Sequence, residues 1–200
     1  MTKVSVCVFA SSCNFLEESF YKAASELGYL LAKNGCKTVY GGSKLGLMWA
    51  CAGTFKQNGG TLIGVMPEKL NDCGLSAGIC DEFYETKGMR ERKAKMDELS
   101  DAVIALPGGF GTLEEVFEMI VQKQLCYSNK PIVFLNTNNY YSKLLEFMDE
   151  IFAKKFAPEK NRGIYFVADT PREAVDYILN YKLPPQTFVY SATESVWGSD

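Results

Sequence analysis

Residues 102–116 read Ala-Val-Ile-Ala-Leu-Pro-Gly-Gly-Phe-Gly-Thr-Leu-Glu-Glu-Val, and this stretch decides the fold. Its first part, Ala102–Leu106, is a short apolar run of the kind that forms a buried strand. Three glycines follow in the loop Pro107–Gly111, and an apolar pattern with a helical period extends over Thr112–Tyr127. A buried strand that passes through a glycine loop into a helix is the unit from which parallel α/β sheets are built.

The same alternation of strand and helix runs through the rest of the chain. Further strands are expected at Val4–Ala10, Thr38–Tyr40, Thr61–Met66, Phe83–Thr86, Ile132–Leu135 and Tyr165–Ala168. Further helices are expected at Glu17–Asn34, Leu45–Asn58, Met89–Ser100, Tyr140–Lys155 and Pro171–Tyr181, the last with Thr170 as its N-cap. This order predicts an α/β fold of three layers, a doubly wound, mostly parallel sheet with helices on both faces.

The extent of the domain follows from the same pattern. We expect one domain over residues 1–183, because 200 residues is the ordinary size of one domain and no linker interrupts the alternation. Residues 67–81 are expected to form a loop, and residues 184–200 a C-terminal tail. In sheets of this class, ligands bind in the crevice beyond the carboxyl ends of the strands. Both glycine-rich loops of the chain fall at such ends.

Composition excludes several classes of function. The chain has no histidine, which removes Ser-His-Asp and Cys-His catalysis and zinc sites that need imidazole. A net charge of −3 argues against nucleic acid and anionic membrane as partners, and no apolar run approaches the ~18 residues of a membrane span. Seven cysteines without a Cys-x-x-Cys pair fit a reducing compartment, so a cytoplasmic location is expected.

The glycine loop before Thr112 has two interpretations. Gly108, Gly109 and Gly111 let the backbone approach an anion closely, and the start of the following helix offers unpaired N–H groups to a phosphate. Alternatively, Thr112 is the N-cap of that helix and Glu115 its capping-box partner. The two interpretations are compatible for Thr112, but they compete for Glu115.

A second glycine loop, Gly41–Met48, is a weaker signal. Ser43 stands where the dinucleotide-binding pattern Gly-x-Gly-x-x-Gly needs its second glycine, so a nicotinamide cofactor is not supported, and no Walker motif exists. Gly42 is a candidate ligand contact, but a turn for close packing of helix on sheet explains the loop equally well. Ser12 and its neighbours Ser11 and Asn14 follow the first strand, where they either contact the base or ribose or cap the next helix.

Two cations lie on the core-facing side of the helix Met89–Ser100. On a helical wheel, Arg92 and Lys93 flank the apolar stripe, whereas Lys95 points away from it. Cations on the buried side need a partner. That partner is a structural carboxylate or a ligand, unless the side chains extend to the surface; we favour the ligand, because this helix precedes the strand that leads into Pro107–Gly111.

The helix Thr112–Tyr127 carries apolar residues over far more than the stripe of about 100° that is typical of a surface helix. This breadth predicts that the helix is buried by its own sheet and leaves its other side for a second subunit.

These motifs together resemble the Lonely Guy family of cytokinin-activating nucleoside 5′-monophosphate phosphoribohydrolases, whose members were often labelled possible lysine decarboxylase. The likeness extends from Val4 to about Tyr181. It rests on Gly-Gly-x-x-x-Gly-Leu-Met at Gly41–Met48, Glu-Arg-Lys-Ala-x-Met at Glu91–Met96 and Pro-Gly-Gly-x-Gly-Thr-x-x-Glu at Pro107–Glu115.

The resemblance implies a Rossmann-like homodimer with active sites near the interface. Its substrate is a small nucleoside monophosphate, AMP or an N6-substituted AMP, which is cleaved to the free base and ribose 5-phosphate without a metal or organic cofactor. By position, Arg92 and Glu115 form the catalytic pair. The expected substrate and phosphate contacts are Ser12, Gly42, Lys93, Gly108, Gly109, Gly111 and Thr112. Ser43, Val121 and Gly74 depart from residues that are frequent in the family, and these changes bear on base selectivity.

Two alternatives have different chemistry. A true lysine decarboxylase needs a lysine that forms a Schiff base with pyridoxal phosphate, and no lysine of the chain has a convincing setting for it. The stronger alternative is a protein that binds a nucleotide or molybdenum cofactor without turnover, since glycine loops alone suffice for that. The positions of Arg92 and Glu115 favour the enzyme.

Overall fold

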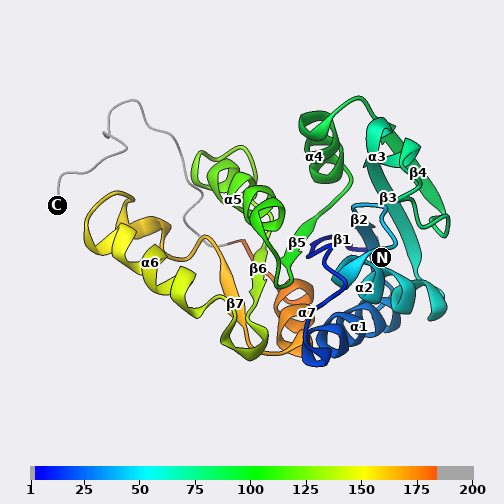
Figure 1. The fold of residues 1–200 in the computed structure, drawn as a ribbon. Helices are drawn as coiled ribbons and strands as arrows, with labels where there is room; N and C mark the ends of the chain where they lie inside the picture. Colours follow the sequence, from blue (N-terminus) through cyan, green and yellow to red (C-terminus); the bar gives the residue numbers. More distant parts are fainter. Residues whose placement is uncertain (1–2, 184–200) are drawn as a thin grey trace.

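The computed structural model describes residues 3–183, so the expected tail at 184–200 lies outside the described residues. Seven strands form one sheet in which every neighbouring pair is parallel, in the order β4-β3-β2-β1-β5-β6-β7 (Figure 1). The strands are β1 (Ser5–Phe9), β2 (Lys37–Tyr40), β3 (Thr61–Pro67), β4 (Glu82–Thr86), β5 (Ala102–Ala105), β6 (Ile132–Leu135) and β7 (Phe166–Ala168).

Helices cover both faces of this sheet, which confirms the predicted three-layer, doubly wound α/β fold (Figure 1). One face packs against α1 (Glu18–Lys33), α2 (Gly46–Gln57) and α7 (Pro171–Leu179). The other face packs against α4 (Met89–Glu98), α5 (Phe110–Gln124) and α6 (Ser142–Ala153). Within residues 3–183, no helix combines the length and the apolar character needed to cross a membrane.

The central strands are buried on both sides, which is why they are apolar without a gap. In β1, Val6 and Val8 belong to the core beneath α1 and α2, whereas Cys7 and Phe9 belong to the core beneath α5. Successive side chains of a strand point to opposite faces, so one short segment supports both layers.

The strand order reverses between β1 and β5. From β1 the chain passes through α1 to β2 on one side, and from β5 it passes through α5 to β6 on the other side. The connections therefore diverge at the carboxyl ends of these two strands, where α/β sheets bind their ligands. The loops that meet there are residues 10–17 and 106–109.

The structure differs from the sequence-based expectations in a few short elements. The segment expected as a loop at 67–81 contains a short helix, α3 (Glu68–Asp72), and two 3₁₀ turns occupy Thr137–Asn139 and Glu159–Asn161. Helix α7 has the predicted N-cap: Thr170 and Glu173 form a complete capping box.

Helix α5 is less evenly buried than its composition predicts. Val121 and Leu125 are 48% and 40% exposed, whereas the charged Lys123 is only 2% exposed. Lys123 donates a hydrogen bond to the hydroxyl of Tyr181 and lies over its ring. The prediction that this helix is buried by its own sheet is confirmed, although one of its buried positions is a cation. Burial of its other side by a second subunit stays a prediction.

Candidate active site

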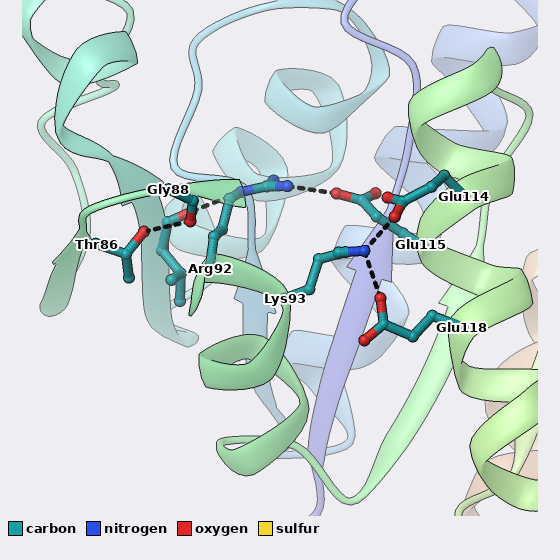
Figure 2. Close-up of polar contacts among 8 residues, drawn as sticks. Thr86, Gly88, Arg92, Lys93, Glu114, Glu115 and Glu118 are labelled. Carbon is teal, nitrogen blue, oxygen red and sulfur yellow. Dashed lines mark hydrogen bonds and ion pairs between the residues drawn. The ribbon is translucent and has the colours of Figure 1, made fainter. Parts of the chain in front are cut away.

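A buried ion pair joins α4 to α5 at the carboxyl edge of the sheet. The Nη1 atom of Arg92 donates to Oε1 of Glu115, and each residue is 7% exposed (Figure 2). The Nε atom of Arg92 donates to the main-chain oxygen of Val65, at 3.1 Å. Arg92 is thus held between β3 and α5, and its planar guanidinium fixes the direction from which it meets the carboxylate.

This contact decides between the two interpretations of Glu115. Helix α5 begins at Phe110 with Gly109 as its N-cap, and no side chain caps this end. Thr112 is therefore the third residue of the helix rather than its N-cap, and the capping-box interpretation is wrong. The Glu115 carboxylate contacts a side chain of another helix and does not close the start of its own helix.

The electrostatic setting of Glu115 is mixed. Burial raises the pKa of the carboxyl above its usual value, and the charge and hydrogen bond of Arg92 oppose this rise. Cys7 of β1 lies close enough that Glu115 adds to the effect of burial in raising the pKa of its thiol. Glu115 therefore lies in a poorly hydrated place, where electrostatic interactions are stronger than in water.

The carbonyl groups of the loop before α5 accept hydrogen bonds from the rest of the protein. The hydroxyls of Tyr141 and Tyr140 donate to the carbonyls of Leu106 and Gly108, both at 2.7 Å, and Ser11 N donates to the carbonyl of Pro107 at 3.2 Å. The first N–H groups of a helix have no partner within the helix, and this end has no side-chain cap. The loop therefore presents main-chain donors and the positive end of α5, which suits a phosphate.

Thr112 lies directly beneath this loop. It is 4% exposed, and a Cβ atom at position 108 would come within 2.1 Å of its Oγ1. Only glycine at position 108 allows the loop to fold this closely over the threonine. Gly109 and Gly111 have no such contact, since a Cβ atom there would meet nothing within 4 Å.

The second glycine loop is built differently. At the start of α2, the N–H groups of Gly46 and Leu47 donate to Asn14 Oδ1 at 2.8 Å and to the Ser11 carbonyl at 2.9 Å. The loop after β1 therefore fills the helix end that a phosphate would use. Asn14 caps α2 and not the next helix, because the N-cap of α1 is Glu17. This arrangement supports the packing interpretation of the loop.

Gly41 of the same loop serves the ion pair. A Cβ atom at this position would lie 2.4 Å from Nη2 of Arg92 and 3.0 Å from Sδ of Met48. The missing side chain is what gives the guanidinium its place beside Glu115. Gly42, the candidate ligand contact, is buried with φ +74°, and its carbonyl accepts from Ala77 N at 2.9 Å.

Lys93 and Ser12 are not part of the Arg92–Glu115 ion pair. Lys93 is buried, and its Nζ atom contacts the carboxylates of Glu114 and Glu118 on α5 (Figure 2). Its partners are therefore structural carboxylates, one of the alternatives left open by the helical wheel. Ser12 is exposed in the loop after β1, next to Ser11, which bonds to both glycine loops.

Several residues of this arrangement could not be identified from sequence motifs. Val65, Tyr140 and Tyr141 hold the arginine and the phosphate loop, but none belongs to a recognisable motif. One signal was available: the two tyrosines follow β6, the strand next to β5, so their loop must lie at the same edge of the parallel sheet.

Comparisons with known proteins agree with the motifs and the fold. The family model described as possible lysine decarboxylase matches residues 48–178, more than half of the chain. A rice protein (Oryza sativa subsp. japonica) named probable cytokinin riboside 5′-monophosphate phosphoribohydrolase LOGL9 is 42% identical over 83% of this chain and 74% of its own length. The rice cytokinin riboside 5′-monophosphate phosphoribohydrolase LOG is 37% identical over 89% of this chain and 75% of its own length.

Among solved structures, the Moco carrier protein from Chlamydomonas reinhardtii superposes with a TM-score of 0.68 at 25% identity, covering 89% of this chain and 98% of that chain. The fold is therefore shared with a carrier protein, whereas the sequence likeness is greater to the phosphoribohydrolases. Motifs, family model and relatives coincide, and the chain belongs to the Lonely Guy family, whose family model is described as possible lysine decarboxylase.

Proposed function

We propose that this protein is a nucleoside 5′-monophosphate phosphoribohydrolase, which cleaves the N-glycosidic bond of AMP or N6-substituted AMP to the free base and ribose 5-phosphate. The observation that carries the proposal is the position of Glu115. It lies in the second turn of α5, one turn beyond the glycine loop at the start of that helix, and faces Arg92 instead of its own backbone. A phosphate bound at the helix start leaves the ribose of the same molecule within reach of this carboxylate.

The chemistry follows from the charges of the reaction. Cleavage of the bond develops positive charge on the ribose and negative charge on the departing base. Glu115 stabilises the cationic sugar and orients a water molecule, as carboxylates do in glycoside hydrolysis. The water supplies a hydroxyl group to C1′ of the ribose and a proton to the base, so the atoms balance without another reactant.

The remaining residues bind and orient in this proposal. Gly108, Gly109, Gly111 and Thr112 hold the phosphate, and Gly42 and Ser12 contact the rest of the nucleotide. Arg92 opposes the effect of burial on the pKa of Glu115, and its bond to Val65 fixes the direction from which the guanidinium meets the carboxylate. In this proposal its charge also binds the phosphate or stabilises the leaving base.

The proposal includes a cytoplasmic homodimer. Val121 on α5, Leu125 directly after it and Phe147 on α6 expose large apolar side chains, which are surfaces that a second copy can bury. The cysteines are free, and Cys7, Cys36 and Cys51 are buried, which fits a reducing compartment. Light scattering of the purified chain tests the dimer, because a monomeric mass at micromolar concentration contradicts it.

Product analysis tests the hydrolase. The purified protein is incubated with AMP, N6-substituted AMP, GMP and CMP, and bases and ribose 5-phosphate are separated by chromatography. We expect release of an adenine-type base by the wild type, and a loss of about 10²–10⁴-fold in Glu115→Gln, the range that positioned acid–base groups contribute. Glu150→Gln is the matched control, because Glu150 pairs with Lys154 on an exposed part of α6.

The outcomes separate the enzyme from the binding protein. Intact nucleotides across the whole panel, together with calorimetric binding of one of them, establish the carrier interpretation. Base release that is equal in Glu115→Gln and the wild type removes Glu115 from the reaction, while leaving the activity itself in place.

A further inference from the structure

Helix α4 has an unusual attachment to the rest of the protein. Its sequence, Met-Arg-Glu-Arg-Lys-Ala-Lys-Met-Asp-Glu, buries three residues, Arg92, Lys93 and Met96, and two of these are cations. Met96 contributes to the core beneath α5, but one methionine is a small apolar anchor for a helix of ten residues. The position of α4, and with it that of Arg92, therefore depends on the ion pairs it makes.

The ion pairs of the two buried cations form a matched set between two helices. Neighbouring cations on α4 meet neighbouring carboxylates on α5: Arg92 contacts Glu115, and Lys93 contacts Glu114 (Figure 2). Lys93 also contacts Glu118, one turn further along α5. The two carboxylates that face Lys93 are partly exposed, while the Lys93 side chain itself is 9% exposed. Both glutamates thus direct their charge inward, toward the lysine.

The surroundings of Glu115 make this arrangement relevant to its charge. The groups that act on Glu115 are Arg92 and Lys93 from α4, Glu114 from its own helix and Cys7 from β1. Glu114 is a like charge, which favours the protonated form of Glu115, and Lys93 has the opposite effect. Burial lowers the pKa of Lys93, but its bonds to Glu114 and Glu118 outweigh this and raise it, so the lysine stays charged at neutral pH.

We propose that Lys93 is a positioning residue, which fastens α4 to α5 and neutralises the carboxylates beside Glu115 without contacting the substrate. This inference rests on the proposed function, because it assigns Lys93 a part in keeping Glu115 ionised for hydrolysis. It also replaces the expectation that Lys93 binds the phosphate, since the side chain that would do so is bound to two glutamates.

The first test replaces the lysine. In Lys93→Met, Glu114 and Glu118 lose their counter-charge, so the acidic limb of the pH profile of kcat/KM moves upward by about one pH unit. Lys93→Arg keeps the charge and restores the wild-type limb. Lys95→Met is the matched control: Lys95 lies on the same helix but pairs with the exposed Glu98, and its removal leaves the limb in place.

The second test removes the carboxylates instead. In the double variant Glu114→Gln, Glu118→Gln, the two negative charges are gone and the positive charge of Lys93 stays. The acidic limb of the pH profile of kcat/KM therefore moves to lower pH. Opposite shifts in the two variants are the signature of the proposal. An unchanged limb in Lys93→Met combined with a raised KM for AMP overturns it in favour of a phosphate contact. Shifts of equal sign overturn it as well.

A readout that needs no turnover keeps the two proposals apart. The Glu115 carboxyl is titrated by ¹³C NMR in the free wild-type protein, in Lys93→Met and in the double variant. If the wild type releases no base but the titration moves in opposite directions, the effect of Lys93 on the charge of Glu115 stands and the hydrolase assignment fails. If base is released but the titration does not move, the hydrolase assignment stands and the proposal for Lys93 fails. Should Lys93→Met not fold, the double variant decides alone, because an unmoved midpoint there contradicts the proposal.

Discussion

Arg92 and Glu115 lie 23 positions apart in the sequence, on consecutive helices, and meet in a buried ion pair above the central strands. The arginine is also bonded to the main chain of β3, so the pair connects two helices and the sheet. Breaking a buried pair by removing one partner leaves the other charge unpaired in a poorly hydrated place. The contact therefore links the stability of the protein to its proposed chemistry.

Replacing Arg92 by lysine tests the geometry of this pair. We expect Arg92→Lys to lower kcat/KM for AMP and to cost about 1–3 kcal/mol in the free energy of unfolding, because an ammonium lacks the planar fork that reaches Val65 and Glu115 together. Urea unfolding and initial rates measure the two effects. The control is Arg90→Lys, an exposed position on the same helix. Wild-type rates in Arg92→Lys would show that charge alone is sufficient.

Gly41→Ala tests the pair without touching either partner. The new Cβ atom would fall 2.4 Å from Nη2 of Arg92, and since that atom ends a flexible side chain, the guanidinium moves and the fold remains. We expect a folded protein with at least about tenfold slower base release, checked by circular dichroism and product assay. Gly53→Ala is the control: its Cβ atom meets Trp49 at an ordinary 3.5 Å, and alanine stabilises a helix by about 0.5–1 kcal/mol. Unchanged rates in Gly41→Ala would separate the position of Arg92 from catalysis.

The pH dependence follows from the raised pKa of Glu115. Its acidic limb in kcat/KM should lie above the ordinary glutamate value of about 4.3, because burial disfavours the charged form. For stability, a folded-state pKa above the unfolded one means that the folded protein binds the proton more tightly. The contribution of Glu115 is therefore fully present below the unfolded pKa and is lost as the pH rises through the folded pKa. Urea unfolding across this range should show a steeper decline in the wild type than in Glu115→Gln, and identical slopes would contradict it.

The lowered pKa of Lys123 predicts that the free energy of unfolding changes with pH in the opposite direction. Burial lowers the pKa of this ammonium from 10.5 to about 8. The folded protein thus binds the proton less tightly, and its free energy of unfolding rises with pH between about 8 and 10.5. We expect Lys123→Met to be more stable than the wild type by up to about 3 kcal/mol at pH 7, with the gain disappearing above pH 10.5. The exposed Lys154→Met serves as the control. A gain that is independent of pH would point to packing instead of charge.

The layers of the fold were predictable because they depend on short-range pattern. The apolar runs that became β1, β5 and β6 are buried on both faces, and such strands are apolar at every position. Helix α3 was not predictable, since none of its residues is buried and it has no apolar period to detect.

The site was predictable only in part, for a related reason. The motif around Glu115 is compatible with a capping box and with catalysis, and only a partner 23 positions away decides between them. Lys123 is a similar case, because its burial depends on Tyr181, 58 positions further along. Contacts at such separations leave no period or spacing in the sequence.

The bonds from the start of α2 to Asn14 and Ser11 bear on how the molecule avoids misplaced substrate. Two helix starts with similar glycine loops point to the same edge of the sheet, and an anion has an intrinsic affinity for either. Because Asn14 already accepts a hydrogen bond at the start of α2, the start of α5 is the one of these two helix ends that an anion can reach without displacing a side chain. In the proposed function, this difference would determine which end of the nucleotide faces Glu115.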